Sequence, residues 1–85
     1  MHSIYVLKSL KDGKLYIGCT SNLGKRIISH NNGDVKSTKS RRPLKLIYNE
    51  NYINKYKAFN KERYYKTAKG KKEIKEKIIN AIESK

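Results

Sequence analysis

The fold is decided by Ser3-Ile4-Tyr5-Val6-Leu7-Lys8 and Lys14-Leu15-Tyr16-Ile17-Gly18-Cys19, two short runs rich in β-branched and aromatic residues. Runs of this composition favour β-strands. Between them stands Lys11-Asp12-Gly13, and an Asp-Gly pair is a strong signal for a tight hairpin turn. We therefore predict that the chain begins with a β-hairpin.

The sequence after the hairpin changes to helical spacing. Thr20-Ser21-Asn22 offers N-cap side chains just before Leu23, and Asn31-Asn32-Gly33 offers a stop, so a short helix is predicted between them. Residues 34 to 43 are polar and basic, and we expect them to form an exposed cationic loop. Leu44-Lys45-Leu46-Ile47-Tyr48 then alternates as a third strand.

Two further helices are expected. One runs from about Asn54 through Tyr65 to Gly70. The last helix carries an apolar stripe, which consists of Ile74, Ile78, Ile79 and Ile82. The predicted class is therefore α+β in the order β-β-α-β-α-α, and residues 1–85 are expected to form a single domain because no linker or repeat divides them.

The chain carries a strong positive charge. It holds 21 Lys and Arg residues against 7 Asp and Glu residues, a formal net charge of +14 over 85 residues. This charge exceeds what solubility needs and favours a polyanionic partner. Nucleic acid is preferred over a membrane surface, because no segment pairs a wide apolar face with a basic one.

The cysteine and histidine content excludes several chemistries. Cys19 is the only cysteine, and the absence of a signal peptide or long apolar run predicts a cytoplasmic chain without disulfides. Cys19, His2 and His30 are too few ligands for a zinc site, and no GxxxxGK phosphate loop occurs. A cysteine enzyme is rejected because nothing in the sequence orients Cys19 and His30.

Arg26 and His30 stand one helical turn apart on the first helix. They could bind one phosphate together, or they could simply border the core. Tyr5 and Tyr16 in the hairpin could relay a proton from water, or they could be packed strand residues with the hydroxyl at the rim. Position alone leaves both pairs open.

Glu62 lies within the apolar arc of its helix, between Phe59 on one side and Ala58 and Tyr65 on the other. A carboxylate in such a place needs a partner. Lys66, one turn later, could make a structural ion pair with it. Alternatively, Glu62 could be a ligand of Mg²⁺, which often takes one or two carboxylates together with waters and phosphate oxygens.

Taken as a set, these residues resemble the GIY-YIG nuclease family, and especially its small stand-alone bacterial members. The likeness covers residues 3 to about 72, and it is carried by Ser3-Ile4-Tyr5, Tyr16-Ile17-Gly18, Arg26, His30, the loop Ser37-Thr38-Lys39-Ser40-Arg41-Arg42-Pro43 and Glu62. The chain is also similar to the N-terminal nuclease domain of excision-repair proteins. Each motif is weak alone, but the combination is specific.

The resemblance implies a small antiparallel sheet flanked by helices, and a single divalent metal, Mg²⁺ or Mn²⁺, held by Glu62. It implies that Tyr5 and Tyr16 help to deprotonate the attacking water, with His30 assisting them or contacting the phosphate. Arg26 would stabilise the charge that develops on the phosphate. The general base stays open among Tyr5, Tyr16 and His30.

Three positions depart from the family pattern. Ser3 stands where the first motif has glycine. Residues 67–72 lack the asparagine that the excision-repair and homing branches have after the glutamate helix. Cys19 follows Gly18 where some relatives carry lysine, a role that Lys66 could fill.

The expected substrate is DNA in duplex, branched or single-stranded form, with RNA left open. We expect backbone contacts from the cationic loop, because its cations and hydroxyls can donate to phosphate oxygens. The residues assigned to this contact are Lys36, Ser37, Thr38, Lys39, Arg41, Arg42 and Lys66. A monomer is expected, with a dimer as the alternative. The alternative function is a catalytically weak nucleic-acid-binding module or an accessory protein in DNA repair or recombination.

Overall fold

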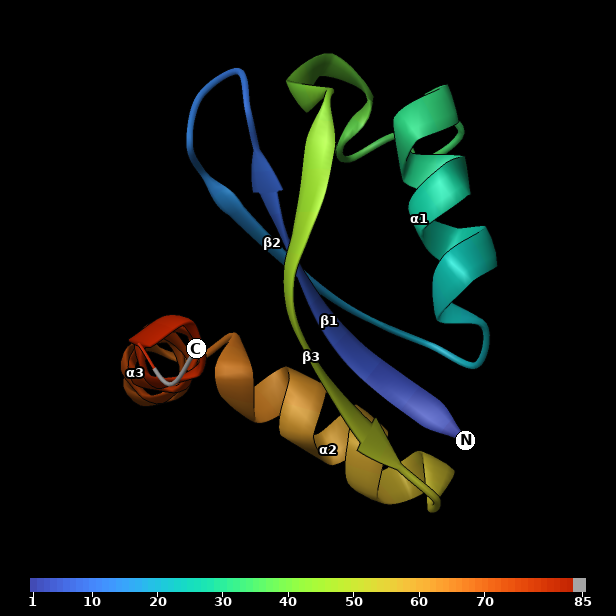
Figure 1. The fold of residues 1–85 in the computed structure, drawn as a ribbon. Helices are drawn as coiled ribbons and strands as arrows, with labels where there is room; N and C mark the ends of the chain where they lie inside the picture. The colour runs from blue at the N-terminus through green and yellow to red at the C-terminus, as the bar shows by residue number, and fades with distance from the viewer. Residues whose placement is uncertain (84–85) are drawn as a thin grey trace.

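The computed structural model describes residues 1–83. Within them, one sheet is formed by β1 (His2–Ser9), β2 (Leu15–Thr20) and β3 (Leu44–Tyr52). The helices are α1 (Leu23–Asn32), α2 (Lys55–Tyr65) and α3 (Ala68–Glu83), and a short 3-10 helix, η1 (Lys39–Arg41), precedes β3 (Figure 1). The predicted α+β class and the order β-β-α-β-α-α are confirmed.

The central strand of the sheet is β1. The strand order is β2-β1-β3, and both pairs are antiparallel. The hairpin turn predicted at Asp12-Gly13 is present, and Gly13 has a φ of 75°, a left-handed conformation in which a Cβ would be strained. The register places Tyr5 opposite Gly18, which brings the first and second motifs side by side.

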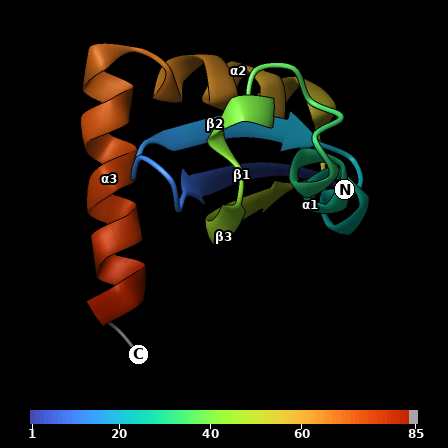
Figure 2. The same cartoon turned by 90° about the horizontal axis from the view of Figure 1, so that it is seen from above.

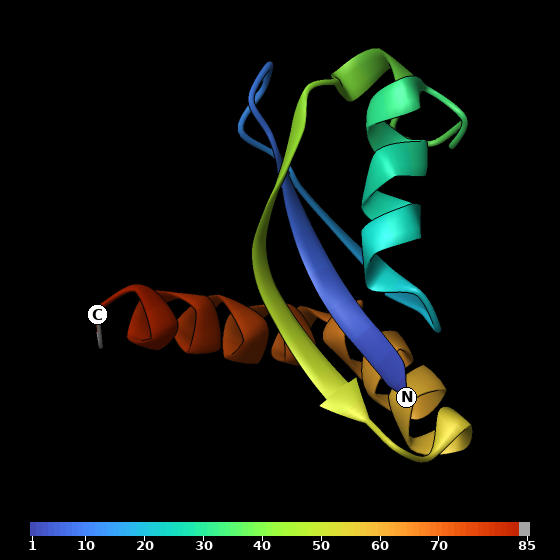
Figure 3. The ribbon, with the colours of Figure 1, turned by 45° about the vertical axis from the view of Figure 1, so that its right-hand side comes forward.

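Alternation along β1 divides the core into two halves. Ile4 and Val6 point toward α2 and α3 and pack with residues of those helices. Tyr5 and Leu7 point to the opposite face, where partly buried side chains of α1 pack against them. Figure 3 shows α1 on one side of the sheet and α2 and α3 on the other. Tyr5, Arg26 and His30 therefore all belong to the α1 face.

The ends of α1 are those that the sequence predicts. The Asn22 side chain accepts a hydrogen bond from the amide of Lys25, and Gly33 ends the helix with a φ of 83°. The side chain of Asn54 caps α2 in the same way. These local signals fix where Arg26 and His30 stand relative to the sheet.

The predicted helix from Asn54 to Gly70 is wrong at its C-terminal end. Helix α2 ends at Tyr65, and α3 begins at Ala68, where the Thr67 hydroxyl accepts a hydrogen bond from the Gly70 amide at 3.0 Å. Gly70 is buried in the first turn of α3, and a Cβ there would collide with the backbone of Tyr64. Glycine is needed for the close approach of the two helices rather than as a stop.

The apolar stripe predicted on the last helix is buried only in part. Ile74 and Ile78 are 1% and 6% exposed, whereas Ile79 and Ile82 are 52% and 62% exposed. Figure 2 shows α3 running across the direction of the strands, and its C-terminal half reaches past the sheet. No helix within residues 1–83 is long and apolar enough to span a membrane.

Candidate active site

The Tyr5 hydroxyl is the centre of a polar cluster between the sheet and α1. It lies 2.9 Å from His30 Nε2, and it accepts a hydrogen bond from Arg26 Nε at 3.3 Å. Tyr5 is 1% exposed and His30 is fully buried. The hairpin and the first helix thus bring together three of the residues that the sequence singled out.

The glycine of the second motif makes room for this hydroxyl. Gly18 pairs with Tyr5 across the β1–β2 ladder. A Cβ on Gly18 would collide with the hydroxyl and the ring of Tyr5. Because Tyr5 is held by His30 and Arg26, it cannot yield without losing those bonds. The glycine is therefore required by the position of the Tyr5 side chain.

His30 is held from its other side by Thr38. His30 Nδ1 lies 2.8 Å from Thr38 Oγ1, and that hydroxyl lies 3.4 Å from the Val35 carbonyl. One arrangement gives every hydrogen a partner: Thr38 donates to Val35, His30 Nδ1–H donates to Thr38, and the Tyr5 O–H donates to His30 Nε2. In this tautomer Nε2 is an acceptor, and the Tyr5 oxygen is free to accept from Arg26.

Burial sets the protonation states of the cluster. It lowers the pKa of His30, and the Arg26 charge lowers it further. Burial also raises the pKa of Tyr5, although the hydrogen bond from Arg26 opposes this shift. The same bond raises the pKa of Arg26. The resting cluster therefore consists of a neutral imidazole, a neutral phenol and a permanent cation.

Tyr16 lies beside this cluster and closer to solvent. Its ring centroid is 5.0 Å from that of His30 and 6.3 Å from that of Tyr5, and its side chain is half-buried. Next to Arg26, a small hollow of about 160 Å³ opens at the start of α1. It is lined by Thr20, Asn22, Lys25, Arg26 and Ser29. The sequence did not identify Lys25 and Ser29 as residues of a candidate site, because polar pairs at i and i+4 occur on most exposed helices.

Glu62 lies on α2 and is half-buried, and its negative charge adds to the pKa values of Cys19 and Tyr5, which burial raises most. Its carboxylate pairs with Lys66 at 3.2 Å, the ion pair that the sequence allowed. Phe59, which was predicted to lie in the buried arc with Glu62, is 40% exposed. The buried residues of α2 are Ala58 and Tyr65, so the buried arc is narrower than predicted.

The donor set around Glu62 fits a cation that is bound mainly by water and substrate. Residues 1–83 contain no cluster of three or more His, Cys, Asp or Glu side chains. A lone carboxylate suits Mg²⁺, which commonly keeps several waters and takes substrate phosphate oxygens. Lys66 would have to release one oxygen of Glu62, and its ammonium group, which is half-exposed, could do so at small cost.

The cationic loop differs from prediction at two residues, Thr38 and Arg41. Thr38 is fully buried against His30, so its hydroxyl is not available to a phosphate at the surface. Arg41 Nε lies 3.6 Å from Asp12, which ties the loop to the hairpin turn. The side chains that remain exposed are Lys36, Ser37, Lys39 and Arg42.

The chain is similar to known proteins over most of its length. A family model described as the GIY-YIG catalytic domain matches residues 1–76. A UPF0213 protein of Staphylococcus saprophyticus is 45% identical over 75 residues, which are 87% of this chain and 90% of the relative. A UPF0213 protein of Clostridium perfringens is 49% identical over 67 residues, which are 78% of this chain and 71% of that relative.

A solved structure has the same fold. The solution NMR structure of a UPF0213 protein from Bacillus halodurans matches with a TM-score of 0.53 and 30% identity, covering 86% of this chain and 80% of that one. The names of these relatives state no reaction or substrate. The chemistry must therefore be argued from the domain family and from the site.

Proposed function

The chain belongs to the GIY-YIG catalytic domain family, and from this membership we propose that it is a metal-dependent endonuclease that hydrolyses phosphodiester bonds in DNA. The family points to a nuclease acting on nucleic acid; the metal, the substrate form and the residue roles are the proposal. The observation that carries it is the cluster in which Tyr5, His30 and Arg26 meet within hydrogen-bonding distance.

The cluster can accept a proton from an attacking water. The Tyr5 oxygen takes a proton from water while its own proton passes to His30 Nε2 along the 2.9 Å bond. His30 then carries the charge, and Thr38 keeps its Nδ1–H in place. Tyr16, which lies nearer to solvent, is assigned to orient the water. Protons balance, since the water loses one and the imidazole gains it.

Arg26 supplies the fixed positive charge at the phosphate. Its Nε donates to Tyr5 and the guanidinium also interacts with Tyr16, so the terminal nitrogens are the groups that would grip two phosphate oxygens. The hollow beside it, lined in part by Lys25 and Ser29, offers donors for a neighbouring phosphate. Charge that develops on phosphorus oxygens is thereby met by groups that are already in position.

Glu62 would hold the divalent cation, Mg²⁺ or Mn²⁺, as the acidic side chain whose charge reaches Tyr5. When bound, such a cation supplies Lewis-acid stabilisation of negative charge on phosphate oxygens.

The test is cleavage of end-labelled DNA in a Mg²⁺ titration, with duplex, branched and single-stranded substrates of one sequence and a matched RNA. We expect cleavage that requires the metal and that stops with EDTA. Binding to these substrates without cleavage at any Mg²⁺ or Mn²⁺ concentration would instead support the alternative, a catalytically weak nucleic-acid-binding module or an accessory protein in repair or recombination.

A further inference from the structure

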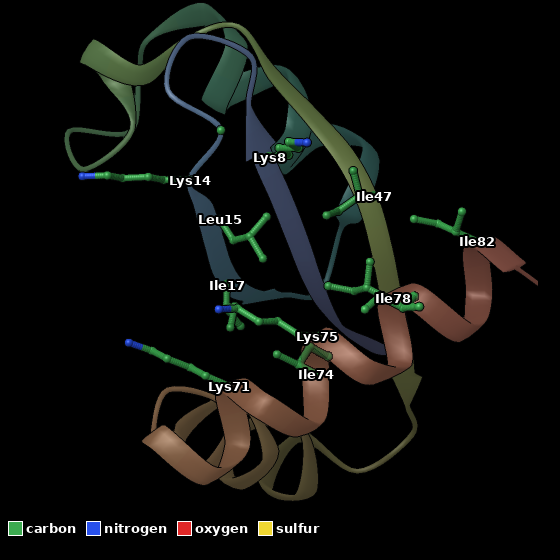
Figure 4. A pocket seen from close by; sticks show the side chains of 12 residues that line it. Lys8, Lys14, Leu15, Ile17, Ile47, Lys71, Ile74, Lys75, Ile78 and Ile82 are labelled. Atoms are coloured by element: carbon green, nitrogen blue, oxygen red, sulfur yellow. The ribbon is translucent and has the colours of Figure 1, made fainter.

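A second surface lies on the opposite face of the sheet, away from Tyr5 and His30. A groove of about 640 Å³ runs between the sheet and α3. Figure 4 shows Leu15, Ile17 and Ile47 of the sheet on one side and Ile74 and Ile78 of α3 on the other. Its floor is aliphatic, and none of the residues assigned to the nuclease site lines it.

The rim of this groove is cationic. Lys8 and Lys14 come from the hairpin, while Lys71 and Lys75 stand one turn apart on α3. The ion pairs within residues 1–83 do not include any of these four lysines. The lining contains no acidic residue. An apolar strip is thus flanked on both sides by lysines that form no ion pair within residues 1–83.

The floor continues onto exposed side chains. Ile79 and Ile82 are 52% and 62% exposed and line the far end of the groove, where α3 reaches past the sheet. From Lys71 to Ile82 the groove follows α3 for about 17 Å, roughly the length of a three-turn helix. Ile74 and Ile78 are themselves buried, so the apolar surface that α3 offers to a partner is that of Ile79 and Ile82.

From this combination we propose that the groove docks an amphipathic helix of a partner protein, with an apolar stripe that covers the isoleucines and acidic residues on both flanks that pair with the four lysines. Charge complementarity selects this occupant. A second copy of the chain would bring a second lysine rim against the first. Duplex DNA would satisfy the lysines but could not cover the isoleucines, and no aromatic side chain lines the groove to stack on bases.

The docking site is independent of the nuclease proposal, and its test measures binding alone. The probe is a labelled synthetic helical peptide of about four turns, with leucines at i, i+4 and i+7 and glutamates on both flanks, long enough to span the groove. The control peptide has the same composition with the leucines scrambled around the helix. Fluorescence anisotropy against the full chain gives both affinities.

We expect the patterned peptide to bind at least about tenfold more tightly than the scrambled one, a difference of roughly 1.4 kcal/mol. The double variant Ile79→Asp/Ile82→Asp should lose at least about tenfold in affinity, whereas Ile53→Asp, at a residue 90% exposed and outside the groove, should lose little. Lys71→Glu/Lys75→Glu should weaken binding more than the matched charge reversal Lys57→Glu/Lys69→Glu. All substituted residues are exposed, so folding should survive.

Four results would overturn the proposal. The patterned peptide could fail to bind, or the scrambled peptide could bind equally well, which would reduce the effect to net charge. The groove variants could bind like their controls. Finally, vesicles of anionic phospholipid or duplex DNA could bind through the same isoleucines and displace the peptide, which would assign the groove to a lipid surface or to nucleic acid.

Discussion

The two faces of the sheet each carry a cluster of tyrosines around a charged group, but the clusters are built oppositely. On the α2/α3 face, the Glu50 carboxylate accepts hydrogen bonds from the hydroxyls of Tyr48, Tyr52 and Tyr65 and from Lys77 Nζ, at 2.6 to 3.0 Å. On the α1 face, two tyrosines gather around a cation, Arg26.

The two clusters differ in whether their charged side chain has all of its bonding partners. Burial alone would raise the pKa of Glu50, but the hydrogen bonds from its neighbours outweigh that effect and lower it. The pKa values of the phenol donors move in the opposite direction: burial and Glu50 raise the pKa of Tyr48 to about 12. Glu50 is therefore closed to further ligands. Arg26 has no carboxylate partner among the ion pairs of residues 1–83, and it lines an open hollow.

We infer that a saturated network holds the fold together, while a cluster with a free charge is available for chemistry. A buried polar network in which every group has its partner rigidifies a core, whereas an unpaired charge next to a cavity is a place for a ligand. Changing one side chain at a time and measuring cleavage and stability together separates the roles of the two clusters.

The largest expected effect is on cleavage when Glu62 is changed. Glu62→Gln keeps the volume of the side chain but removes the ligand charge, so metal-dependent cleavage should fall by at least about a thousandfold. Thermal unfolding and DNA binding should stay close to those of the wild type, because an ion pair with the half-exposed Lys66 stabilises the fold little. A Glu62→Gln variant that cleaves at the parent rate would refute the assignment of the metal to this residue.

The matched change in the Glu50 network should do the reverse. Glu50→Gln removes the charge that Lys77 and the three phenols share, and it should cost about 1 to 3 kcal/mol of unfolding free energy. Because the folded pKa of Glu50 lies below its ordinary 4.5, its stabilisation is present above pH 4.5 and is lost as pH falls through the folded pKa. The stability gap between wild type and variant should thus shrink below pH 4.5.

Denaturant titrations from pH 7 to pH 3 measure this gap. Cleavage by the folded variant should be normal at low denaturant, since Glu50 does not contact the nuclease cluster. A gap that stays constant with pH would show that the charge of Glu50 is not what stabilises the fold.

A smaller loss is expected at Arg26. Arg26→Lys retains the positive charge but cannot reproduce the planar fork, and it loses the Nε bond to Tyr5. Turnover should drop at least about tenfold, an amount on the scale of one charge-assisted contact. Lys77→Arg on the opposite face is the control and should leave turnover unchanged. Equal turnover by the Arg26→Lys variant would show that Arg26 provides charge only.

The effect of Thr38 should be smaller again, because it acts through His30. Thr38→Val keeps the shape of the side chain but removes the acceptor for His30 Nδ1–H, so the tautomer with a free Nε2 is no longer favoured. We expect turnover to fall by about three- to tenfold, within the contribution of one neutral hydrogen bond. Thr38→Ser should restore it. If the valine and serine variants have the same turnover and the same pH profile, Thr38 is only a packing residue.

Local signals in the sequence were sufficient for the hairpin, the caps of α1 and the set of residues on the α1 face. Asp12-Gly13 and Asn22 act within a few residues of themselves, and helix spacing fixes Arg26 and His30 relative to each other. The helical arc singled out Glu62 and its partner Lys66, one turn away, and the GIY-YIG resemblance supplied its expected role as a metal ligand. These are the features that periodicity and capping encode.

What the sequence could not reveal depends on contacts between distant elements. Glu50 is joined to Tyr65 and Lys77, 15 and 27 residues away, and nothing near Glu50 in the sequence announces them. In the sequence Thr38 belongs to a polar loop, and only the folded loop before β3 brings its hydroxyl against His30 of α1. Gly70 suggests a helix stop in the sequence, although glycine is needed there because a Cβ would collide with the backbone of Tyr64.

The smallest effect on turnover is expected from the exposed cations of the loop before β3. Three cations of this loop are exposed and close in sequence to His30 and Thr38: Lys36, Lys39 and Arg42. We therefore expect them to contact the DNA backbone. Arg41 is left unchanged because it pairs with Asp12 and holds the loop. Replacing the three exposed cations with glutamine should weaken binding to all DNA sequences alike.

A salt series decides whether these contacts are local. Each lost phosphate contact should reduce the slope of log affinity against log salt by about one unit, and turnover at saturating DNA should change little. The control replaces Lys57, Lys69 and Lys72 with glutamine, which removes the same charge from the α2/α3 side. If both triple variants lower the slope equally, DNA responds only to the net charge of the protein. A steeper loss for the loop variant alone places the DNA on the α1 face, where Arg26 lines the hollow.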